Sequence, residues 1–148
     1  MTDAEKQVLL AALHAEYAAV YAYGVIAAYA APDRTRLIAE AGAAHRARRD
    51  TTIDTLKTAG VSVPPPDAAY LTPFPIDDPI PAARLAATVE SDTAIAWRAV
   101  IEGLDSTAST QVRRLALDAL TECAVRLATW QSILGANPPT IPFPGRAQ

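Results

Sequence analysis

The sequence is poor in cysteine, histidine and glycine, with one, two and six of these residues in 148. A single cysteine, Cys123, excludes an intrachain disulfide and a cysteine-rich zinc site, and because it falls on an apolar stripe we expect a buried, unreactive thiol. No run of 18 or more apolar residues occurs, so a membrane-spanning helix is not expected. The acidic N-terminus, MTDAEK, does not resemble a secretion signal. We therefore expect a soluble, cytoplasmic protein.

Basic charge is also scarce. Thirteen lysine and arginine residues against 16 aspartate and glutamate residues give a net charge of -3 and a pI near 5.3. The densest basic cluster, Arg46, Arg48 and Arg49, is short and is followed by Asp50. Such a chain has no general attraction to a phosphate backbone, so we expect neither nucleic acid nor a membrane as a partner.

The twelve prolines fall in clusters and leave four long segments free to form helices. Thr2 followed by Glu5 is the pattern of a capping box, and Gly60 suits the left-handed end of a helix. No segment has the alternating pattern of a half-buried strand. We predict one all-α domain over residues 1–148, with helices at about 3–31, 33–59, 80–104 and 107–134 and a proline-rich tail at 136–148.

The lengths of the connections predict how the helices are arranged. Only a few residues separate the first helix from the second and the third from the fourth, so each pair forms an antiparallel hairpin. The segment from Gly60 to Pro79 is much longer, and at about 3.3 Å per extended residue it can travel the length of the bundle. Two hairpins joined by one long crossover are the plan of a ferritin-like four-helix bundle. The expected anchors of the crossover are Tyr70, Leu71, Phe74 and Ile76, and those of the tail are Ile141 and Phe143.

Three ionisable residues interrupt the apolar stripes of three different predicted helices. Glu16, His45 and Glu90 each stand at a core position in the series of three- and four-residue steps. Arg49 shares the inward face with His45, and Glu122 lies at the margin of the fourth stripe. An unpaired ion in a low-dielectric core costs several kcal/mol, so these groups must coordinate a metal, share protons or pair with one another.

Two interpretations of this set remain open. In the first, Glu16, His45 and Glu90, with Glu122, converge as oxygen and nitrogen ligands of a single iron, manganese or zinc ion. In the second, Arg49 and His45 neutralise Glu16 and Glu90 in a buried ion-paired network. The chain is then a structural or interaction module without catalysis. No small-molecule ligand is identified by the sequence.

A complete di-iron centre is not expected. Di-iron carboxylate bundles use one glutamate from each of two helices and a Glu-x-x-His motif from each of the other two. Here Gly42 stands three residues before His45, and Val125 stands three residues after Glu122, so two of the six ligands are missing. Oxidase or ferroxidase activity is therefore not expected, and we find no nucleophile paired with a base that would indicate another enzyme class.

Four short segments resemble a known family. They are residues 16–24 (EYAAVYAYG), residues 44–50 (AHRARRD), Tyr70 followed by Pro73, and residues 143–145 (FPG). Together they resemble the ferritin-like domain family of unknown function found mainly in actinobacteria. The resemblance implies a four-helix bundle and places the first two polar core residues where ferritins carry ligands, but it implies no reaction. Bundles of this kind commonly self-associate, so we expect a homodimer.

Overall fold

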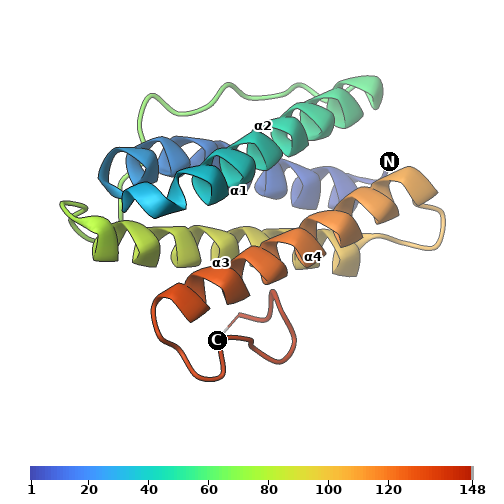
Figure 1. The fold of residues 1–148 in the computed structure, drawn as a ribbon. Helices are drawn as coiled ribbons and strands as arrows, with labels where there is room; N and C mark the ends of the chain where they lie inside the picture. Colours follow the sequence, from blue (N-terminus) through green and yellow to red (C-terminus); the bar gives the residue numbers. More distant parts are fainter. Residues whose placement is uncertain (148) are drawn as a thin grey trace.

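The structure, a computed structural model, describes residues 1–147 and contains four long helices (Figure 1). No strand is present in this part of the chain. A short 3-10 turn, Pro32–Arg34, precedes the second helix. The helices are α1 (Asp3–Tyr29), α2 (Thr35–Thr58), α3 (Pro79–Gly103) and α4 (Thr110–Ile133).

The helices form the two antiparallel hairpins that the connection lengths predict. α1 pairs with α2 and α3 pairs with α4, and the segment from Ala59 to Asp78 runs back along the bundle, so that α2 and α3 are parallel (Figure 1). The close contacts are α1 with α2, α1 with α3, and α3 with α4, whereas α2 and α4 barely touch. The predicted all-α four-helix bundle with one long crossover is therefore confirmed.

Side-chain caps determine where three of the helices begin. Thr2 and Glu5 form the expected capping box at α1, and Asp78 accepts a hydrogen bond from the backbone of Ile80 at α3. α4 begins three residues later than predicted, because Asp105 Oδ1 accepts both the backbone N–H and the hydroxyl of Thr107, each at 2.6 Å. Thr107 is therefore part of a turn, and the helix is capped further on by Ser109.

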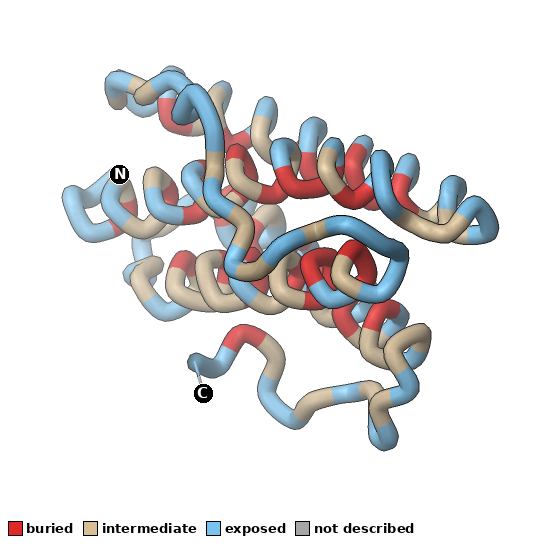
Figure 2. The backbone as a smooth tube through the Cα atoms, turned by 90° about the vertical axis from the view of Figure 1, so that its left-hand side faces the viewer, coloured by how far each residue is buried: buried red, intermediate tan, exposed pale blue. Residues whose placement is uncertain are grey.

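The apolar core is divided into two clusters. One gathers the C-terminal part of α1, the N-terminal parts of α2 and α3 and the C-terminal part of α4, and the other gathers residues from the opposite ends of the same helices. Buried positions follow the inward faces of the helices along the bundle (Figure 2). Most charged and polar residues that are fully buried lie between the two clusters, in the middle of the helices.

The crossover and the tail pack only in part as expected. Tyr70 lies against Tyr21, with ring centroids 5.5 Å apart, and Phe74, Ile76 and Ile141 pack against the core. Leu71 is fully exposed and Phe143 is 66% exposed, so both were wrong as anchors. The tail is held instead by Gly145, whose backbone lies so close to α3 that an added Cβ would be 2.5 Å from a backbone oxygen.

By length and composition alone, α1 could cross a bilayer. Half of its most apolar window is buried inside the bundle, and the helix carries the buried carboxylate of Glu16. These are the properties of a core helix in a bundle. No other described helix is both long enough and apolar enough to cross a membrane.

Candidate functional site

The three ionisable residues that interrupt the predicted stripes meet at the centre of the bundle. Glu16 on α1, His45 on α2 and Glu90 on α3 are all fully buried. His45 lies between the two carboxylates: its Nδ1 is 2.8 Å from Glu16 Oε2, and its Nε2 is 3.2 Å from Glu90 Oε1. Each ring nitrogen therefore has a carboxyl partner, and a His45 protonated at both nitrogens would donate to both.

The arginine in this cluster is Arg48, and the expectation for Arg49 was wrong. Arg48 is 5% exposed at its side chain and donates to Glu16 Oε1 at 3.1 Å and to Glu122 Oε2. Arg49 points to the other side of α2 and pairs with Asp50 at 2.8 Å. At about 100° per residue, the two arginines flank His45 at roughly 60° and 40° on opposite sides. The stripe could not separate them, because only the packing of the neighbouring helices shows that Glu16 and Glu122 lie beside Arg48.

We call Glu16, His45, Arg48 and Glu90 the central polar cluster. Glu16 accepts a third hydrogen bond, from the indole N–H of Trp97 at 2.7 Å. Burial opposes the charged form of this carboxyl, but the hydrogen bond and charge of His45 and the charge of Arg48 outweigh it and lower the pKa of Glu16. Glu16 is consequently a carboxylate with donors on both oxygens.

Nearby carboxylates in turn favour the charged forms of the two basic groups, His45 and Arg48. Burial opposes protonation of His45, yet its hydrogen bonds to Glu16 and Glu90 prevail, and the pKa of His45 is raised above its ordinary value of 6.5. Burial also opposes the charge of Arg48, and Glu16 outweighs it, so the pKa of Arg48 is raised as well. The cluster thus contains two acidic and two basic groups whose charges can cancel.

A line of aromatic donors leads to Glu90. Tyr23 donates its hydroxyl to Glu90 Oε1 at 2.6 Å and accepts from the indole N–H of Trp130 at 3.1 Å. Burial, followed by the charge of Glu90, raises the pKa of the Tyr23 phenol. The ring of Tyr23 also stacks on His45, with centroids 5.3 Å apart. In contrast, Glu90 Oε2 is buried without a hydrogen-bond partner among the described residues.

α4 contributes a thiol and a partly exposed carboxylate. Cys123 is fully buried, as expected, and its Sγ accepts from Arg48 at 3.3 Å. Burial is the main reason that the pKa of Cys123 is raised, so the thiol stays protonated and unreactive. Glu122 is half exposed and binds Arg48 and Arg126. It lies at the rim of the cluster and not among the buried carboxylates.

The chain has only part of the ligand set of a di-iron bundle. The two single glutamates are present on α1 and α3. Where a Glu-x-x-His pair would be needed, α2 has Gly42 and His45 and α4 has Glu122 and Val125. Within residues 1–147, no three histidine, cysteine or acidic side chains are grouped so that they could hold a metal ion.

Gly42 and Val125, the two positions at which the sequence lacks a di-iron ligand, lie in different surroundings. A Cβ on Gly42 would lie 3.4 Å from the Arg46 side chain and 3.7 Å from Tyr23, which is ordinary van der Waals contact. Val125 is 62% exposed and faces away from the cluster. A histidine at that position would not reach the core.

Tyr23, Arg48, Trp97 and Trp130 are the site residues that sequence reasoning missed. Tyr23 stands on the same stripe as Glu16, and Trp97 on the same stripe as Glu90. Buried tyrosine and tryptophan usually find a polar partner, which is the signal that could have identified these two.

Comparison with known proteins agrees with this architecture. The chain has a TM-score of 0.84 and 38% identity to the crystal structure of a conserved hypothetical protein, rv2844, from Mycobacterium tuberculosis, over 90% of this chain and 99% of that chain. No curated protein matches the sequence. Residues 8–148 match a domain of unknown function, DUF4439. Because this match covers nearly the whole sequence, the chain belongs to the DUF4439 family.

Proposed function

We propose that this chain is a non-enzymatic structural or interaction module whose core is held by a buried ion-paired network in place of a metal. The observation that carries the proposal is the position of His45, which has a carboxylate within hydrogen-bond distance of each ring nitrogen. A metal ligand must offer an unprotonated nitrogen, and here neither is free. The protein's own donors also take both oxygens of Glu16 and Oε1 of Glu90.

Charge balance supports the same proposal. Glu16 and Glu90 bring two negative charges into the core, and His45 and Arg48 bring two positive charges. A divalent ion added to this set would leave an uncompensated buried charge unless a proton or the Arg48 side chain were displaced. Without an added ion, the proposed network leaves no such uncompensated charge.

A single iron, manganese or zinc ion is the second candidate, and one observation favours it. Glu90 Oε2 is buried without a partner in the described part of the chain, and buried polar atoms are nearly always satisfied by protein, water or an ion. If a metal is bound, Glu90, His45 and Glu16 are the residues that would hold it, with Glu122 able to join only from the rim. An ordered water would satisfy the same atom in the network proposal.

Metal content and metal-dependent stability distinguish the two candidates. Protein produced in medium containing iron, manganese and zinc is analysed by mass spectrometry for metals, and its urea unfolding is measured with EDTA and with each ion. A ligand at 100 times its dissociation constant would add about 2.7 kcal/mol to the free energy of unfolding. We expect no stoichiometric metal and no such gain. About one equivalent of metal that is lost in Glu16→Gln would overturn the network proposal.

We also propose that the chain forms a homodimer in the cytoplasm and binds neither nucleic acid nor membranes. Leu117 and Val125, which are 57% and 62% exposed, lie eight residues apart on one side of α4. A second copy of the chain would cover them. Sedimentation at micromolar concentration tests this: we expect a dimer that dissociates in Leu117→Glu, and a wild-type monomer would contradict it.

A further inference from the structure

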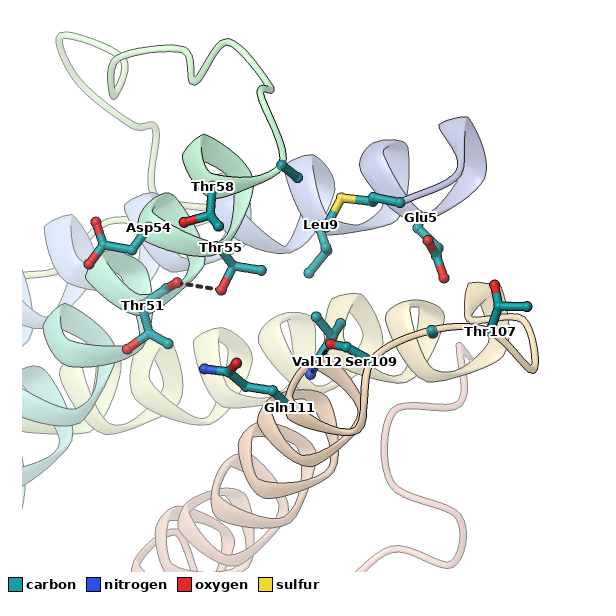
Figure 3. Close-up of a pocket in the computed structure, with 13 residues that line it drawn as sticks. Glu5, Leu9, Thr51, Asp54, Thr55, Thr58, Thr107, Ser109, Gln111 and Val112 are labelled. Carbon is teal, nitrogen blue, oxygen red and sulfur yellow. Dashed lines mark hydrogen bonds between the residues drawn. The ribbon is translucent and has the colours of Figure 1, made fainter.

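A second polar feature lies at the end of the bundle that is opposite the α1–α2 loop. A pocket of about 550 Å³ opens between the start of α1, the end of α2 and the start of α4 (Figure 3). This volume is within the range of about 300–1,000 Å³ of small-molecule sites. Glu5, at one side, is eleven residues before Glu16, or roughly 16 Å along the helix, so the pocket is separate from the central polar cluster.

Glu5 supplies the buried charge of this pocket. It is only 4% exposed, and Figure 3 shows its carboxylate directed from α1 into the gap beside the loop that leads to α4. Oε2 accepts the backbone N–H of Thr2 at 2.7 Å in the capping box, but Oε1 has no hydrogen-bond partner among the described residues. A buried carboxylate oxygen without a donor indicates that a donor from outside the chain belongs there.

Three of the hydroxyl groups around the pocket already donate their protons within the chain. Thr51 and Thr55 donate to backbone oxygens one turn earlier in α2, at 3.0 and 2.8 Å, and Thr107 donates to Asp105 at 2.6 Å. Their remaining capacity is to accept hydrogen bonds. These three hydroxyl groups therefore present acceptors to the pocket, and they suit a ligand that donates several hydrogen bonds.

The charge of the lining indicates the same kind of ligand. Asp54 adds a second carboxylate, which lies on the α2 side of the pocket opposite Glu5 (Figure 3), and it forms no ion pair within residues 1–147. No lysine or arginine lines the pocket among the residues that the structure describes. Leu9 and Val112, which are 0% and 8% exposed, are the apolar side chains behind the pocket wall.

We propose that this pocket binds a small aliphatic diamine or polyamine. One ammonium group, with three N–H donors, occupies the position beside Glu5 Oε1, the methylene chain crosses Leu9 and Val112, and a second ammonium lies near Asp54. A metal ion fits less well, because no group of three metal-ligating side chains exists in the described chain. A neutral diol would leave the charge of Glu5 unbalanced.

Calorimetric titration of the intact protein with putrescine, cadaverine and spermidine tests the proposal. n-Butylamine and 1,4-butanediol serve as the matched monoamine and the uncharged analogue. We expect at least one of the three amines to bind, and its affinity to exceed that of n-butylamine by about tenfold and that of the diol by more, since two ion pairs and several hydrogen bonds distinguish them. Absence of binding by all three, or equal binding of the diol, would overturn the proposal.

Three variants locate the binding. Glu5→Gln removes the charge but keeps the capping box, which accepts glutamine at this position, so the helix should still form. We expect it to weaken binding about tenfold or more, whereas Asp3→Asn, an acidic residue in the same turn paired with Lys6, should leave binding unchanged. Ala108→Phe keeps every charge and fills the pocket, so it should abolish binding. Equal affinity in wild type and Glu5→Gln, or retained affinity in Ala108→Phe, would show only general attraction of cations to an acidic protein and would refute the site.

Discussion

Replacing Arg48 with methionine tests the ion-paired network most directly, because methionine keeps most of the aliphatic stem and removes the charge. Removing one partner of a buried ion pair typically costs about 3–5 kcal/mol, since the other charge is left uncompensated. In this chain Glu16 retains two donors, His45 and Trp97, and half-exposed Glu122 can be solvated. We therefore expect the lower end of that range, about 3 kcal/mol, or a fall in Tm of roughly 6–12 °C for a chain of this length.

Arg49→Met is the matched control for this experiment. The same substitution one residue later affects a side chain that is 26% exposed and pairs only with Asp50 near the surface. Such pairs contribute about 0–1 kcal/mol. Urea unfolding followed by far-UV circular dichroism, with EDTA present, measures both variants. Equal losses in Arg48→Met and Arg49→Met would refute the assignment of Arg48 to the core.

A double-mutant cycle then separates the charge interaction from simple packing. Glu16→Gln should reduce the further cost of Arg48→Met, because the carboxylate that the guanidinium compensates is no longer charged. Residues in one network usually show coupling of about 0.5–3 kcal/mol. Additive losses within about 0.3 kcal/mol would mean that Arg48 stabilises the fold by packing alone.

Three further outcomes are expected. Glu16, with its lowered pKa, contributes stability above its ordinary value of 4.5, and His45, with its raised pKa, contributes below its ordinary value of 6.5. The free energy of unfolding should therefore be higher at about pH 5.5 than at about pH 8.5, and the difference should vanish in His45→Gln but persist in the exposed-residue control His14→Gln. Trp97→Phe removes a hydrogen bond to a buried carboxylate and should cost about 1.5–3 kcal/mol in urea unfolding; a loss below about 0.5 kcal/mol would contradict the role of the indole N–H. Gly145→Ala should release the tail from α3, because the added Cβ meets a backbone oxygen at 2.5 Å, and faster hydrogen exchange of the tail amides with unchanged exchange in the helices would demonstrate it.

Much of the fold is predictable from the sequence because local signals agree with one another. Proline clusters mark the connections, the Thr2 and Glu5 pair marks the first helix, and the length of the crossover leaves one arrangement of two hairpins. The start of α4 is not fixed locally in the same way. Several residues between Asp105 and Ser109 can cap a helix, and the choice among them depends on which side chain first forms a turn.

The polar core is predictable only in part, for a geometric reason. A residue that falls on the middle of an inward face, such as Glu16 or Glu90, is buried whatever helix packs against it. Residues at the edges of the face, such as Arg48 and Arg49, are buried on one side or the other according to the neighbouring helix. Leu71 illustrates the same limit in the crossover, where no helical periodicity indicates which side chain faces the bundle.

The proposed network also explains how two buried glutamates can be kept without a metal. In a di-iron bundle the positive charge between the carboxylates comes from the ions, and the histidines bind them as neutral ligands. In the proposed network the positive charge is covalently attached, on Arg48 and on a His45 protonated at both nitrogens, and both groups lie within hydrogen-bond distance of the same carboxylates. Such a core is charge-neutral without the open coordination that oxygen chemistry requires. The network proposal therefore predicts that stability follows the protonation of His45 and not the supply of metal.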